Sequence, residues 1–208
     1  MAFRRGRDKA FRPVDPPDLL VVGLGNPGAE FEGTRHNLGW EVVGILARRG
    51  GIALSRSRQR STVAVGAVDG LRLALACPLT YMNNSGEAVR LLMQRFSLEP
   101  RQLVAVYDDI DLAFARIRIK DGGGTGGHQG LNSIVNHLHS KEFVRLKIGV
   151  GRPPGRMDPA EYVLRRFSKT EREEIDVVLE EAADAVVSIG RNGVAAAMNA
   201  YNGVRPEP

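Results

Sequence analysis

The sequence predicts a single α/β domain in which three layers, α/β/α, enclose a mixed, mostly parallel and twisted sheet. Two observations support this prediction. Apolar runs typical of strands buried on both faces occur at residues 19–24 and 103–107. Segments with helical periodicity alternate with the strand-like segments along the chain, as they do in α/β proteins. A length of 208 residues is sufficient for one domain with a sizeable core.

Glycines and turn residues mark where the first elements end. Gly50 and Gly51 terminate the first helix, and Asp69-Gly70 is a strong hairpin signal. Asn84 or Ser85 can cap the next helix. The predicted elements of this half are a strand at 19–24, a helix from about 37 to 49, strands at about 61–68 and 71–77, and a helix ending at Phe96.

The second half continues the alternation. The run LVAVY ends in acidic residues, and ARIRIK alternates basic and apolar side chains, as a strand with one exposed face does. A glycine-rich segment, DGGGTGG, precedes the third helix. The predicted elements here are strands at 103–107 and 115–120, a helix from about 128 to 139, a strand at 143–150, and helices at about 169–189 and 193–202.

Composition and charge limit the classes of protein. The net charge is +5, and the positive excess lies before residue 158, so a polyanionic partner is plausible. Residues 1–18 are expected to be a flexible basic tail without the apolar stretch of a secretory signal, which leaves 19–208 as the single α/β domain. No apolar run approaches the roughly 20 residues of a membrane span, and the single cysteine, Cys77, suits a reducing cytoplasm. We expect a soluble, cytoplasmic protein with no membrane partner.

One glycine pattern invites a different interpretation. Gly23, Gly25 and Gly28 match the dinucleotide-binding fingerprint G-x-G-x-x-G after a strand. That fingerprint requires a helix to begin within the glycines, so that its first amides meet the pyrophosphate. Pro27 and the glycines make this stretch a poor helix, and helical periodicity begins only near Asn37. We therefore expect no dinucleotide cofactor.

Polar residues at the ends of predicted elements are the candidates for a site. They are Asn26, His36, Asn83, Asp108 and His128. Parallel strands share an edge, and active sites gather beyond their carboxyl ends. A His and an Asp from separate loops can form a base and the group that orients it, with water as the nucleophile. The two histidines could instead ligate a metal with aspartates, but no metal-binding spacing is present, so no metal is expected.

Five segments resemble bacterial peptidyl-tRNA hydrolases and occur in that family's order. They are GNPGAEFEGTRHNLG, P-x-T-Y-M-N-N-S-G-E-A-V, YDDIDL, GGGTGGHQGLNSI and FVRLKIGVGRPPG. The resemblance covers about residues 19–200. It implies a monomeric, metal-free enzyme without a cofactor that cleaves the ester between a peptide and the terminal ribose of tRNA.

The resemblance also implies roles for particular residues. His36 corresponds to the catalytic base and Asp108 to its partner. Asn26 and Asn83 correspond to active-site asparagines, of which Asn26 is associated with preferring blocked over free aminoacyl groups. Asn83 is our candidate donor to the oxyanion.

Other positions correspond to the substrate cleft, and two of them depart from the family. Phe31 and Tyr81 match cleft-lining positions, and His128 opens the helix beside the cleft. The family usually has Asn where this chain has Gln129, and often Tyr where Phe31 stands. Both departures affect substrate contacts and neither removes the base.

Basic residues near the third helix are expected to contact tRNA phosphates, which position the substrate without reading its sequence. They are Arg116, Arg118, Lys120, Arg145 and Lys147. A plainer interpretation is that ARIRIK is only an exposed strand face. Two rival functions are a non-catalytic RNA-binding protein, as some organellar relatives of the family are, and a nucleotide-dependent oxidoreductase.

Overall fold

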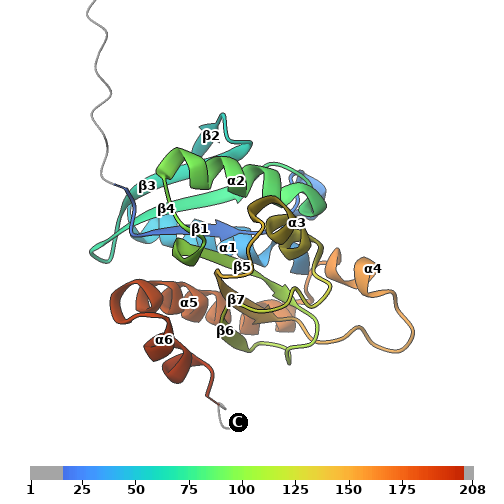
Figure 1. The fold of residues 1–208 in the computed structure, drawn as a ribbon. Coiled ribbons are helices and arrows are strands. Elements are labelled where there is room, and N and C mark those ends of the chain that lie inside the picture. The colour runs from blue at the N-terminus through green and yellow to red at the C-terminus, as the bar shows by residue number, and fades with distance from the viewer. Residues whose placement is uncertain (1–15, 204–208) are drawn as a thin grey trace, which may run out of the picture.

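A computed structural model describes residues 16–203 of the chain and shows one seven-stranded sheet covered by helices (Figure 1). The strand order is β2-β3-β4-β1-β5-β7-β6. The strands are β1 (Leu19–Gly23), β2 (Ser55–Ser57), β3 (Ser61–Val68), β4 (Leu71–Pro78), β5 (Leu103–Asp109), β6 (Ile117–Asp121) and β7 (Val144–Gly149). The adjacent strands β4, β1, β5 and β7 are parallel, whereas β2–β3, β3–β4 and β6–β7 are antiparallel pairs. The predicted mixed, mostly parallel sheet is confirmed.

Helices cover both faces of this sheet. The helices are α1 (Leu38–Arg49), α2 (Ser85–Phe96), α3 (Gln129–Leu138), α4 (Pro159–Val163), α5 (Lys169–Asn192) and α6 (Val194–Tyr201). Alternate residues of β1 show the layering. Val21 joins the core beneath α1 and α5, whereas Leu20 and Val22 join the core beneath α2 and α3. Three layers result, as the sequence predicted.

The parallel strands bring their carboxyl ends to one edge of the sheet, where four loops meet. Asp108 is the penultimate residue of β5 at this edge, and the loop after β1 carries Asn26 and His36. The segment after β6 is returned to the same edge by glycines at 122–127, four of which adopt positive φ. L-residues with side chains rarely adopt that conformation. This course of the chain places His128 beside Asp108.

The structure adds elements that the sequence did not indicate. The short strand β2 and the one-turn helix α4 were not predicted. Asn84 and Ser85 do flank the start of α2, but neither side chain caps it; the Ser85 hydroxyl donates instead to the Met82 carbonyl. Of the predicted tail, residues 1–15 lie outside the described residues. Its last residue, Asp18, is hydrogen-bonded to Arg72 beside β4.

Candidate active site

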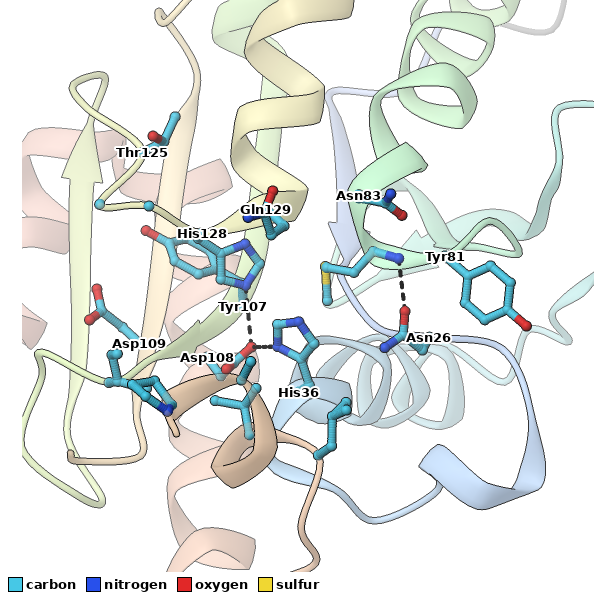
Figure 2. Close-up of a pocket in the computed structure, with 18 residues that line it drawn as sticks. Asn26, His36, Tyr81, Asn83, Tyr107, Asp108, Asp109, Thr125, His128 and Gln129 are labelled. Carbon is cyan, nitrogen blue, oxygen red and sulfur yellow. Dashed lines mark hydrogen bonds and ion pairs between the residues drawn. The ribbon is translucent and has the colours of Figure 1, made fainter. Parts of the chain in front are cut away.

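A cavity of about 550 Å³ opens at the carboxyl edge of the sheet (Figure 2). Most of the residues predicted for the site lie around it. The lining includes Asn26, His36, Tyr81, Met82, Asn83, Tyr107, Asp108, Asp109, His128, Gln129 and the α4 residues Pro159, Ala160 and Val163. The structure therefore brings these predicted residues together at the edge where parallel strands end.

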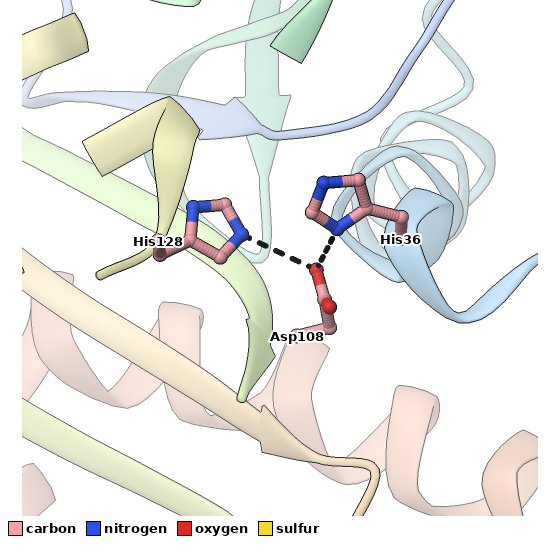
Figure 3. Close-up of side chains that lie close together, drawn as sticks. All are labelled: His36, Asp108 and His128. Atoms are coloured by element: carbon pink, nitrogen blue, oxygen red, sulfur yellow. Dashed lines mark hydrogen bonds and ion pairs between the residues drawn. The ribbon is translucent and has the colours of Figure 1, made fainter. Parts of the chain in front are cut away.

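His36 and Asp108 form the central pair (Figure 3). Nδ1 of His36 lies 2.8 Å from Oδ1 of Asp108, although His36 precedes α1 and Asp108 belongs to β5. An ionised carboxylate can only accept hydrogen bonds, so Nδ1 of His36 carries the proton. Nε2 of neutral His36 is then unprotonated and can accept a proton from a water molecule. This is the arrangement that a general base requires.

His128 binds the same carboxylate oxygen as His36 but, unlike His36, has no ring nitrogen left free. Its Nε2 lies 3.3 Å from Oδ1 of Asp108, and its Nδ1 accepts the Leu131 N–H at 3.4 Å. Both ring nitrogens are therefore occupied in the neutral form. His128 also packs against the edge of Tyr107, with ring centroids 4.8 Å apart. It holds Asp108 and begins α3, while His36 alone of the two has a nitrogen available for chemistry.

The environment keeps Asp108 ionised. The side chain is buried, and burial alone would raise its pKa. The charge and hydrogen bonds of His36 and His128 outweigh burial and hold the pKa of the carboxyl well below its usual range. Asp108 is therefore an anion throughout the physiological pH range and can orient both imidazoles.

Close packing of α1 on the sheet brings His36 to this carboxylate. His36 lies in a short 3-10 helix, Arg35–Asn37, immediately before α1. Three residues later, a Cβ on Gly39 would lie 2.3 Å from the carbonyl oxygen of Val106, two residues before Asp108. Only glycine permits this approach. The spacing between helix and strand thus sets the distance between base and carboxylate.

Asn26 is held rigidly and in a defined orientation. Its backbone N–H donates to Oδ1 of Asn37 at 2.8 Å, and Nδ2 of Asn37 donates back to its carbonyl at 3.0 Å. The Asn26 Oδ1 accepts the Met82 N–H at 2.8 Å. That bond fixes which end of the amide is oxygen, so Nδ2 of Asn26 is left to donate into the cavity. The sequence analysis did not assign Asn37 a role; its signal was its place directly after His36.

The remaining predicted cleft residues divide into two groups. Asn83, Tyr81 and Gln129 line the cavity and are exposed, with Tyr81 59% accessible. Asn83 and Tyr81 lie on the opposite side of the cavity from Asp109 (Figure 2). Phe31 is half-buried in a 3-10 turn and is not among the residues lining the cavity.

The predicted basic residues also divide. Arg118 and Lys120 are exposed on β6, with the neighbouring isoleucines buried, as the alternation predicted. Lys147 is largely buried and forms an ion pair with Asp109. Arg116 precedes the strand and is half-buried.

The prediction that Arg145 contacts phosphate is wrong. Its side chain is fully buried, because β7 is an internal strand with neighbours on both sides. The guanidinium donates to the carbonyls of Lys141, Phe143 and Gly123, the last at 2.7 Å. Arg145 therefore anchors the start of the glycine-rich segment from inside.

Arg35, beside the proposed base, was also missed. Its buried guanidinium lies 4.3 Å from the ring centroid of Tyr162 and 4.6 Å from that of Phe167. It donates to the carbonyls of Arg165 and Arg166, and lies 2.6 Å from a carboxylate oxygen of Glu171. These contacts clamp the His36 turn to the chain segment joining α4 to α5.

His36, Asp108 and His128 together have donor atoms that could hold a metal ion. Donor atoms of His36, Asp108 and His128 all lie within 4.8 Å of one another. The hydrogen bonds favour a metal-free arrangement, because Nδ1 of His128 accepts the Leu131 N–H and therefore carries no proton. The His128 proton is then on Nε2, facing Asp108, where a metal would need a lone pair.

Comparisons with known proteins give the family. The sequence profile of the peptidyl-tRNA hydrolase family matches residues 20–208. A peptidyl-tRNA hydrolase of Rhodococcus opacus is 50% identical over 181 residues, covering 86% of this chain and 95% of the relative. One from Chloroflexus aggregans is 48% identical over 184 residues, covering 88% and 98%. The crystal structure of the Acinetobacter baumannii peptidyl-tRNA hydrolase superimposes with a TM-score of 0.85 at 35% identity, covering 91% and 96%. The chain therefore belongs to the peptidyl-tRNA hydrolase family.

Proposed function

We propose that the protein hydrolyses the ester bond between a peptide and the terminal ribose of tRNA, with His36 as the general base. The observation that carries this proposal is the 2.8 Å hydrogen bond between Nδ1 of His36 and Asp108. It leaves Nε2 of His36 unprotonated and facing the cavity. Family membership supports peptidyl-tRNA as the substrate.

The chemistry needs only protein groups and water. Nε2 of His36 removes a proton from water as the water oxygen attacks the ester carbonyl. The carbonyl oxygen becomes an oxyanion, to which the Asn83 side-chain amide can donate; one such donor is worth about 3–4 kcal/mol where it has been measured. The protonated His36 then returns the proton to the departing ribose oxygen, and Asp108 stabilises the imidazolium throughout. No metal or other cofactor takes part in these steps.

Asn26 can explain a preference for blocked aminoacyl groups. Its Nδ2 faces the cavity as a donor, because its oxygen is engaged by Met82. A peptidyl substrate presents an amide carbonyl that accepts such a hydrogen bond. A free α-ammonium has donors only, so it would place donor against donor. Discrimination then follows from hydrogen-bond polarity rather than from size.

The direct test is release of peptide from N-blocked aminoacyl-tRNA, with the unblocked form as the control. Rapid release from the blocked form alone supports the proposal. Binding of tRNA without any release would instead identify a non-catalytic RNA-binding protein with an idle site.

The tRNA body is proposed to lie over β6 and β7, where Arg118 and Lys120 are exposed and Lys147 is nearby. The double variant Arg118→Glu/Lys120→Glu should raise KM and flatten the salt dependence of affinity. The slope of log Kd against log salt should fall by about 0.9 for each phosphate that these side chains no longer neutralise.

A matched control has the same charge change elsewhere. Arg48 lies at the end of α1, and Arg101 precedes β5 at the opposite edge of the sheet. The variant Arg48→Glu/Arg101→Glu should leave the slope near that of the wild type. Equal slopes for the two double variants would mean that the β6 residues are only a solvated face.

Gln129, the first residue of α3, is proposed to position the substrate without taking part in the chemical step. Gln129→Asn should change KM by less than tenfold, since both side chains carry an amide and differ by side-chain entropy of up to about 1 kcal/mol. Gln129→Ala should weaken full-length substrates more than minimal esters. Equal losses on both substrates, or a collapse of the single-turnover rate, would assign Gln129 to catalysis.

We further propose that residues 19–208 act as one catalytic domain and that the protein is a cytoplasmic monomer. Within residues 16–203, no helix has the length and apolar character needed to cross a membrane. Sedimentation of the purified protein, with and without tRNA, tests the oligomeric state.

A further inference from the structure

A second basic surface lies at the other end of the sheet from Arg118 and Lys120. The segment SRSRQRS forms β2 and the turn into β3, and we call its arginines together with one from α2 the hairpin surface: Arg56, Arg58, Arg60 and Arg95. All four are exposed.

Two of these arginines are held in place by their neighbours. Arg60 forms an ion pair with Glu87 on α2. Nη1 of Arg95 donates to Oγ of Ser57 at 3.3 Å and to Oε1 of Gln59 at 3.0 Å. The side chains of Arg56 and Arg58 have no ion-pair or hydrogen-bond partner within residues 16–203. Arg60 and Arg95 are thus held in place, and such side chains lose less entropy on binding an anion than mobile ones do. The guanidinium groups of Arg56 and Arg58 are free to bind an anion.

A second hollow shares lining residues with this surface and with the catalytic cavity. It has a volume of about 490 Å³ and is lined by Arg56, Arg60, Thr80 and Tyr81, among others. Tyr81 lines both this hollow and the catalytic cavity. Oγ1 of Thr80 is buried there and has no hydrogen-bond partner among residues 16–203. A buried hydroxyl with no partner is costly unless a ligand or water satisfies it.

We propose that the hairpin surface is a second contact for the phosphate backbone of the substrate tRNA. The proposal rests on the proposed function, in which the ester lies at His36. The peptide is the other part of the substrate that could reach this surface. Peptides from different proteins differ in charge, whereas every tRNA presents the same phosphates, so a fixed cluster of arginines suits the RNA. The substrate tRNA would then contact both basic ends of the sheet and hold its ester at the centre.

The test compares Arg56→Glu/Arg58→Glu with the control Arg48→Glu/Arg101→Glu, which changes the net charge equally. Deacylated tRNA is the probe, and Kd is measured from 50 to 200 mM salt without any turnover. We expect the hairpin variant to lower the log–log slope by about 0.9 for each phosphate left without its arginine. The control slope should stay at the wild-type value. Both variants should keep the wild-type Tm and the kcat of the wild type at saturating substrate.

Two outcomes would overturn the proposal. A hairpin slope equal to the control slope overturns it, because the arginines then face only water. A KM increase that appears with acidic blocked peptides but not with neutral ones, on the same tRNA, also overturns it and assigns the surface to the peptide. Failure of the proposed function is separate, since a wild-type protein that binds tRNA but releases no peptide leaves the slope comparison valid.

Discussion

Replacing His36 with alanine should lower kcat on N-blocked aminoacyl-tRNA by about 10²–10⁴-fold, the usual contribution of a general base. KM and Tm should stay close to wild type. The imidazole lies in a turn at the cavity and adds little to the core. Asp108 keeps its hydrogen bond to His128 in the variant, so the buried carboxylate is not left without a partner.

His139 supplies the matched control for this loss. It is exposed at the end of α3, away from the cavity lining, with a φ of 52°. His139→Asn removes an imidazole while keeping a residue that tolerates the left-handed conformation, so its rate should match the wild type. A His36→Ala enzyme with wild-type single-turnover rate would rule out the proposed mechanism.

Replacing Asp108 with asparagine should cost less, on the order of 10–100-fold in kcat, since a hydrogen bond to a charged group is worth about 1.5–3 kcal/mol. The amide has the shape of the carboxylate but no charge to stabilise the imidazolium. If its NH₂ faces His36, the ring must place its proton on Nε2, which is the wrong tautomer for a base.

The pH–rate profile distinguishes this role from simple structural support. Asp108→Asn removes a charge beside the base, so its pH–rate profile should differ in shape from that of the wild type. A reduced rate with the wild-type pH–rate profile would show that Asp108 maintains only the shape of the cavity. A Tm measured on the same sample separates unfolding from loss of orientation.

The sequence predicted the parts of the fold that carry strong local signals. The apolar runs of β1 and β5, the Asp69-Gly70 hairpin and the helical periods of α1 and α2 lie where the pattern placed them. The short elements β2 and α4, of three and five residues, are too brief to show a period. Their positions are set by tertiary contacts, which local patterns do not record.

The site was predictable where it follows from sheet geometry. Asp108 at the end of β5 and His36 after β1 meet because parallel strands share an edge. The prediction for Arg145 was wrong although basic and apolar residues alternate in its strand, because the burial of Arg145 depends on the strand order. Nothing local indicates that β7 lies between β5 and β6. Likewise, the hydrogen bond from His128 to Asp108 depends on the path of a glycine-rich segment, which local patterns do not indicate.

The Arg35 clamp has a consequence for the order in which the chain acquires activity. All seven strands end before residue 150, whereas the partners of Arg35 lie between Tyr162 and Glu171. Closing so long a loop carries an entropic cost that grows with its length, so such contacts tend to form after local ones. A nascent chain could therefore complete its sheet and still lack a fixed His36. Catalytic competence is then a late step of folding, reached only when the segment between α4 and α5 docks.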